Sequence, residues 1–128
     1  MRYQLLSLIK KLQISEHVEL KGYVENPLKY FRKADIFALS SHVEGMPNVL
    51  IEAMMAGCTP VATDCQTGPR EILKSEDYGY LVEVGNPNSM YLGLLKALEK
   101  PITQEKLSEV VNNFSEKIII KKHLSYLK

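Results

Sequence analysis

The chain has 128 residues, of which 45% are hydrophobic and 24% are charged, and its formal net charge is +1. This length is typical of one globular domain, and the balanced charge gives no indication of a nucleic-acid partner. The two cysteines lack the spacing and the partner residues of a zinc site, so we expect reduced thiols. The longest apolar runs are too short to span a bilayer, and we expect no signal peptide.

The predicted elements alternate between helices and strands along the chain. A helix comes first, because apolar residues recur at helical spacing over residues 1–12. Strands are expected at 18–24, 35–41, 59–65 and 79–84. Helices are expected at 27–34, 47–56, 89–100, 103–114 and 115–127. The alternation predicts an α/β fold, a Rossmann-like parallel sheet with flanking helices.

Two carboxylates, Glu44 and Glu52, flank the start of the predicted helix 47–56. Pro47 suits the first helical position, and Gly57 suits the left-handed residue just past the helix end. Glu52 then lies about 7–8 Å beyond Pro47 along the helix axis. Backbone N–H groups and the positive end of the helix dipole at this start favour a phosphate or pyrophosphate. An anion there could carry one hydroxylated group toward Glu44 and another toward Glu52.

The carboxyl ends of the predicted strands provide a natural place for such a ligand. In open parallel sheets, ligands bind outside these ends. The ends are predicted at Gly22–Val24, Ser40–Glu44 and Asp64–Arg70. We expect all three to lie on one rim of the sheet, together with the two glutamates.

Several blocks of residues occur in the order and spacing of one enzyme family. They are Gly22-Tyr23-Val24, Asp35-Ile36-Phe37, Glu44-Gly45-x-Pro47 through Glu52-Ala53, Gly57-x-x-Pro60-Val61, Gly68-x-x-Glu71-Ile72 and Gly79-x-Leu81-Val82. The chain thereby resembles the C-terminal, nucleotide-sugar donor domain of retaining GT-B glycosyltransferases of family 4. The resemblance covers almost the whole chain and is weakest at the C-terminal end.

The resemblance implies a role for each matching residue. Glu44 would be catalytic, offsetting positive charge near the anomeric centre of the donor sugar. Glu52 would accept hydrogen bonds from the ribose hydroxyls. No DxD-like pair of acids occurs, so neither a metal nor another cofactor is implied. The remaining donor-binding positions act mainly through the backbone: Gly45, Met46, Pro47 and Asn48 hold the sugar and pyrophosphate, and Gly22, Tyr23 and Val24 line the base.

The chain departs from the family pattern at its N-terminal side. The family has earlier strands, a basic pair that grips the diphosphate and an N-terminal acceptor domain, none of which has a counterpart here. We therefore expect residues 1–114 to form a partial donor-binding domain, the incomplete C-terminal half of a GT-B fold. In the family strand order 3-2-1-4-5-6, strands 1 and 2 would be absent. We expect the isolated chain neither to transfer sugar nor to fold robustly.

The basic tail at residues 115–128 is expected to form a helix that packs on the missing N-terminal domain. Its apolar residues alternate with lysines, so contact with an anionic membrane is the alternative.

A second departure is the stretch TGPREI at 67–72, in which Pro69 precedes Arg70. This variant resembles enzymes that build bacterial cell-envelope polysaccharides, which implies a hexose or N-acetylhexosamine donor. Arg70 is a candidate to replace part of the missing basic pair that binds the diphosphate. The alternative is that Arg70 is only a solvent-exposed residue in the first turn of a short helix. His42, beside Glu44, is either an acid or base or a hydrogen-bonding spacer.

The leading hypothesis is the donor-binding part of a retaining glycosyltransferase that acts on a glycan or lipid-linked acceptor. We expect a cytoplasmic location, with peripheral contact at the inner face of the membrane as an open alternative, and no nucleic-acid partner. A GT-B-type nucleotide-sugar epimerase or phosphorylase and a non-catalytic nucleotide-binding or interaction module also stay open. An NAD-binding Rossmann domain is disfavoured, because no G-x-G-x-x-G follows any predicted strand.

Overall fold

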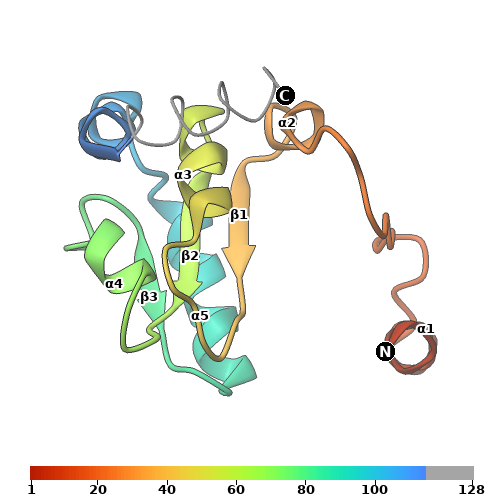
Figure 1. The fold of residues 1–128 in the computed structure, drawn as a ribbon. Helices are drawn as coiled ribbons and strands as arrows, with labels where there is room; N and C mark the ends of the chain where they lie inside the picture. The colour runs from red at the N-terminus through yellow and green to blue at the C-terminus, as the bar shows by residue number, and fades with distance from the viewer. Residues whose placement is uncertain (115–128) are drawn as a thin grey trace.

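The computed structural model describes residues 1–114, which contain a three-stranded parallel sheet (Figure 1). Its strands are β1 (Ile36–Leu39), β2 (Thr59–Thr63) and β3 (Tyr80–Val82), adjacent in that order. Ile36 pairs with Thr59 in the register of β1 and β2, and Val61 pairs with Tyr80 in that of β2 and β3. Three of the four predicted strands and their parallel arrangement are therefore confirmed.

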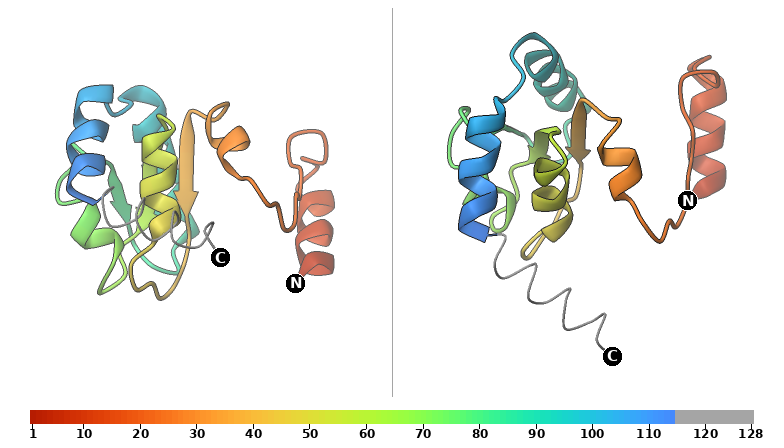
Figure 2. Two further views of the ribbon diagram at one scale, coloured as in Figure 1. Left: turned by 45° about the horizontal axis from the view of Figure 1, so that its top comes forward. Right: turned by 90° about the horizontal axis from the view of Figure 1, so that it is seen from above.

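Helices cover both faces of this sheet (Figures 1 and 2). The labelled helices are α1 (Arg2–Lys11), α2 (Leu28–Phe31), α3 (Asn48–Met55), α4 (Pro69–Ile72) and α5 (Pro87–Glu99). Residues 104–114 are also helical, up to the last described residue. Helix α3 and residues 104–114 lie on one face, and α5 lies on the other (Figure 2). The predicted helix at 115–127 lies outside the described residues.

The core forms where α3 and α5 sandwich β2. Every residue of β2 is buried, as expected for a central parallel strand with helices on both faces. Helix α3 contributes an apolar face that is wholly inaccessible to solvent at Leu50 and Ile51. The main core members are Leu50, Ile51, Met54, Val61, Ala62, Ile72, Leu73, Tyr80, Val82, Ala97, Leu107 and Val110.

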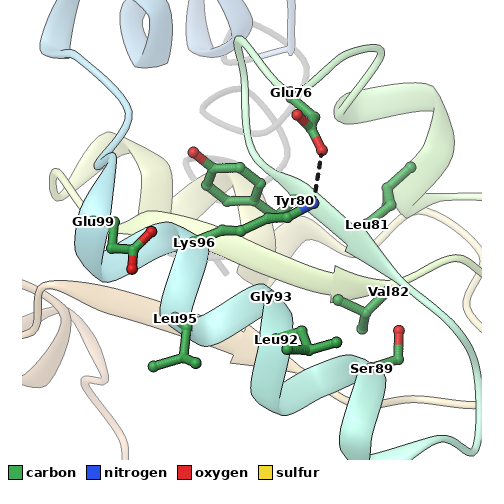
Figure 3. Close-up of a pocket in the computed structure, with 10 residues that line it drawn as sticks. All are labelled: Glu76, Tyr80, Leu81, Val82, Ser89, Leu92, Gly93, Leu95, Lys96 and Glu99. Carbon is green, nitrogen blue, oxygen red and sulfur yellow. Dashed lines mark hydrogen bonds and ion pairs between the residues drawn. The ribbon is translucent and has the colours of Figure 1, made fainter.

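A glycine allows α5 to approach the sheet closely. A Cβ atom placed on Gly93 would lie 2.5 Å from Val82 Cγ1 and 3.0 Å from Val61 Cγ1. Figure 3 shows Gly93 facing Val82 at the edge of the sheet, in a groove of about 410 Å³. An ion pair of 3.3 Å between Lys96 Nζ and Glu76 Oε1 crosses this groove. None of the predicted site residues lines it.

The ends of α3 lie close to those predicted. Gly57 follows the helix with φ +99°, the left-handed conformation expected of it. Pro47, however, is the residue before the helix and not its first helical residue, because its ψ of 83° is not helical. The helix therefore begins at Asn48, and Glu52 is its fifth residue.

The predicted strand at 18–24 is wrong, because residues 18–24 contain no strand. A strand requires a neighbour for its backbone hydrogen bonds, and the described sheet ends at β1 without pairing this segment. Gly22 also turns the chain, with φ +65°. The predicted N-terminal helix does form as α1, but none of its residues is buried in the described structure.

Candidate functional site

Two loops meet at the carboxyl ends of β1 and β2, where the sequence predicts a ligand. Gly68, with φ +85°, lies so close to the first loop that a Cβ atom on it would be 2.2 Å from the carbonyl oxygen of Gly45. The same Cβ would lie 3.0 Å from Pro47 Cδ. Only glycine fits this contact, which holds the residues around Glu44 against the loop that leads into α4.

Short hydrogen bonds hold Glu44 in this position. The Ser41 hydroxyl donates to Glu44 Oε1 at 2.6 Å. The Thr67 hydroxyl donates to the backbone carbonyl oxygen of Glu44 at 2.8 Å. The side chain of Glu44 is half-buried and lines a hollow of about 310 Å³ together with His42 and Asp64. One carboxylate thus faces a cavity large enough for a small ligand, held by both loops.

The start of α3 adjoins the Glu44 loop. No side chain caps this helix. The N–H groups of its first turn therefore donate no hydrogen bond to a capping side chain. The backbone already uses two of these groups: Asn48 N–H donates to the Met46 carbonyl at 2.9 Å, and Leu50 N–H donates to the Pro47 carbonyl at 2.9 Å. Pro47 has no N–H to offer. A ligand at the helix start therefore has fewer free donors than the sequence suggests.

Arg70 lies on the same rim but is held by Asp64. Its Nε and Nη2 donate to the two carboxylate oxygens of Asp64 at 2.8 and 2.9 Å. The hydrogen bonds from Arg70 hold the pKa of Asp64 below its usual value of 3.8. The Arg70 side chain is 60% exposed, so the guanidinium edge that does not face Asp64 is accessible to a ligand.

The predicted site residues fall into two groups in space. Glu44, Gly45, Met46, Pro47 and Asn48 form one continuous loop and helix start, beside which Arg70 lies on the next loop. Glu52 follows on α3, half-buried.

Residues 22–24 make up the second group. They lie on the segment that leads away from the sheet toward α1 (Figure 1). None of the hydrogen bonds among residues 1–114 joins them to the rim, and Tyr23 is 91% exposed. The structure therefore does not bring the predicted base-lining residues to the glutamates.

Ser41, Thr67 and Asp64 support the site and were not predicted as functional residues. Asp64 could have been found, because it ends a strand on the rim and precedes Arg70 in the next loop. The hydroxyl groups of Ser41 and Thr67 carry no signal in the sequence, since their partners are set by the way the two loops fold. The Thr63 hydroxyl likewise donates to the Ser41 carbonyl across the strand ends.

The described residues offer neither a metal-binding cluster nor a membrane-spanning helix. Within residues 1–114, His, Cys, Asp and Glu side chains form no group of three or more that could hold a metal ion. In the same residues, no helix combines the length and the apolar character needed to cross a bilayer.

The fold and the rim define a class of protein. The parallel sheet flanked by helices is the fold found in part of the GT-B glycosyltransferases. The family model described as "Glycosyl transferases group 1" matches residues 1–114, and the chain belongs to this family.

Individual proteins show the same likeness. The chain is 44% identical over 110 residues to the N-acetylgalactosamine-N,N'-diacetylbacillosaminyl-diphospho-undecaprenol 4-alpha-N-acetylgalactosaminyltransferase of Campylobacter jejuni, covering 86% of this chain and 29% of that protein. A crystal structure of a mutant of TarM from S. aureus, in complex with fondaparinux, α-GlcNAc-glycerol and UDP, is similar with a TM-score of 0.77 and 28% identity. That likeness covers 95% of this chain and 26% of TarM.

Sucrose-phosphate synthase from Thermosynechococcus elongatus shares the fold, with a TM-score of 0.80 at 22% identity over 98% of this chain and 33% of that one. The chain thus spans about a third or less of the length of these proteins.

Proposed function

We propose that this chain is the donor-binding part of a retaining glycosyltransferase. The enzyme would move a hexose or N-acetylhexosamine from a nucleoside diphosphate sugar to a cell-envelope glycan or lipid-linked acceptor. The observation that carries the proposal is the contact between the two rim loops, which fixes the Glu44 carboxylate at a hollow on the rim, in the loop that leads into α3. The name of the Campylobacter relative and the UDP in the TarM complex support a nucleotide-sugar donor and a lipid-linked acceptor.

In this proposal, Glu44 stabilises the positive charge that develops at the anomeric carbon as its bond to the diphosphate breaks. The acceptor hydroxyl attacks from the face that the diphosphate leaves, and its proton passes to the departing phosphate oxygen. Ser41 keeps the Glu44 carboxylate oriented through the 2.6 Å hydrogen bond. The free edge of the Arg70 guanidinium and the start of α3 then face the departing negative charge.

Glu52, which lies on α3, would bind the ribose hydroxyls. We further place the enzyme in the cytoplasm, with its acceptor reached through the N-terminal half of the longer protein. Transfer itself is expected to need residues beyond those of this chain, so turnover by purified 1–128 would contradict this part of the proposal.

Donor binding is tested by NMR titration of the ¹⁵N-labelled chain with UDP, GDP and ADP sugars. Replacing Glu44 or Glu52 by Gln removes one charge without changing shape, and each change should weaken binding by about ten-fold or more. Glu99→Gln is the matched control, because Glu99 is exposed at the far end of α5. Binding that is unchanged in both Glu44→Gln and Glu52→Gln would refute the site assignment.

A further inference from the structure

The loop between β2 and α4 is anchored without the ion pair of Asp64 and Arg70. Cys65 is 3% exposed, Gly68 packs closely against the preceding loop of the rim, and Pro69 is buried at the start of α4. These contacts hold both ends of the loop in place. The ion pair therefore has another consequence, which is to fix the side chain of Arg70 itself.

The carboxylate of Asp64 binds one edge of the Arg70 guanidinium. Nε and Nη2 of Arg70 each donate to a different carboxylate oxygen, at 2.8 and 2.9 Å. A guanidinium has five N–H donors, so three remain, one on Nη2 and two on Nη1. Within residues 1–114, these three have no partner. Asp64 is fixed in turn by the sheet, because its N–H donates to the Val82 carbonyl at 2.7 Å.

This guanidinium lies at the border of the proposed donor site. Asp64 lines the hollow at Glu44, and Arg70 is bound directly to Asp64. A planar guanidinium with free N–H groups is suited to phosphate oxygens, which can accept two parallel hydrogen bonds from it. An exposed arginine without a partner would occupy many rotamers, and a ligand would have to order it. The ion pair removes most of that ordering before the ligand binds.

We propose that Asp64 is a positioning residue, which holds Arg70 in the orientation in which its free N–H groups bind the diphosphate of the donor. The inference rests on the proposed function, since it takes the ligand at this rim to be a nucleoside diphosphate sugar. Asp64 accepts hydrogen bonds from Arg70 and does not contact the anion. Its carboxylate places a negative charge near the diphosphate, and the ordering of Arg70 outweighs this repulsion.

Two substitutions separate positioning from simple charge attraction, with the dissociation constant of UDP measured by NMR titration. Asp64→Asn removes a negative charge, so attraction alone would strengthen UDP binding. Loss of the oriented ion pair should instead weaken it by about three- to ten-fold. Arg70→Lys keeps the positive charge but cannot donate to both carboxylate oxygens in parallel, so it should weaken UDP binding by a similar factor.

The ion pair beside α5 supplies a matched control. Glu76 binds Lys96 at 3.3 Å and is exposed, so Glu76→Gln removes the same charge from an ion pair away from the rim. This variant should bind UDP as the unchanged chain does. Because the ion pair on the rim is also partly exposed, Asp64→Asn and Arg70→Lys should keep the amide spectrum of the folded chain.

The side-chain signal of Arg70 reports its orientation directly. The chain has three arginines, Arg2, Arg32 and Arg70, so Arg70→Lys assigns the Nε–H signal in ¹H–¹⁵N spectra. The hydrogen bond to Asp64 should slow the exchange of this proton with water, and Asp64→Asn should remove the protection. UDP should shift the Arg70 signal saturably in the unchanged chain.

The outcomes distinguish this inference from the proposed function. Equal or tighter UDP binding by Asp64→Asn, unchanged binding by Arg70→Lys, or an Arg70 signal that UDP does not move would each overturn the role of Asp64. The donor site would stand if Glu44→Gln still weakened the binding of UDP sugars. An Arg70 response that depends on Asp64, with UDP-sugar binding unchanged in Glu44→Gln and Glu52→Gln, would refute the glutamate site and leave the role of Asp64 in place. Failure of the unchanged chain to bind UDP would overturn both.

Discussion

The contact between Gly68 and Gly45 makes a sharp prediction about the rim. In Gly68→Ala, the new Cβ would sit 2.2 Å from the Gly45 carbonyl oxygen, a distance that real Cβ atoms essentially never show. Gly68 also has φ +85° and ψ −93°, a backbone conformation that costs an L-residue about 1–3 kcal/mol. Relief of the clash requires the loops to separate, which costs a further amount of about 1–3 kcal/mol.

The expected loss of unfolding free energy is therefore about 2–6 kcal/mol. This is a large part of the roughly 6–19 kcal/mol expected for 128 residues. Urea unfolding followed by circular dichroism at 222 nm measures this loss of unfolding free energy. An m-value equal to that of the unchanged chain would show that the substitution leaves the folded and unfolded states equally compact. Binding of a UDP sugar should weaken as well, because the Glu44 loop is displaced.

Two glycines on the same rim separate the clash from the backbone strain. Gly85 has φ +70° but nothing within 4 Å of a Cβ, so Gly85→Ala should lose only about 1–2 kcal/mol. Gly45 has open space and no positive φ, so Gly45→Ala should stay within about 0.5 kcal/mol of the unchanged chain. The reasoning is refuted if Gly68→Ala loses no more stability than Gly85→Ala.

Three further predictions follow from the packing and the charges. Gly93→Ala should lower the unfolding free energy measured in urea by about 1–3 kcal/mol, because the new Cβ would lie 2.5 Å from Val82 Cγ1. An unchanged unfolding free energy would contradict this prediction and show that α5 can shift away from the sheet. Arg70 lowers the pKa of Asp64, so the stabilisation that this pair provides is complete above about pH 4 and is lost as the pH falls through the folded pKa. The unfolding free energy of Asp64→Asn should not show this fall at low pH. The same fall at low pH in Asp64→Asn and in the unchanged chain would contradict the prediction. Burial raises the pKa of the Cys58 thiol, so Cys58 in a Cys65→Ser chain should react with DTNB more slowly when folded than in urea; equal rates would contradict its burial.

The periodicity of the sequence predicted the core elements because that information is local. Apolar residues on both sides of Glu52, namely Leu50, Ile51, Ala53 and Met54, predict a buried helix face, and TPVAT at 59–63 predicts a strand buried on both sides. The conformation of Gly57 was equally readable, since a helix end favours a residue that tolerates positive φ. The segment at 18–24 shows the limit of such reasoning: its residues favour a strand, but a strand exists only where a neighbour supplies hydrogen bonds.

The sequence by itself predicted the three strands of the described sheet, the position of Glu44 and Glu52 around one helix, and the family to which this pattern belongs. Only the tertiary structure decided that Gly68 touches Gly45, that Ser41 and Thr67 hold Glu44, and that Asp64 occupies one edge of Arg70. These contacts join residues from separate loops, and their distances depend on how two strand ends are placed side by side, which no local pattern encodes.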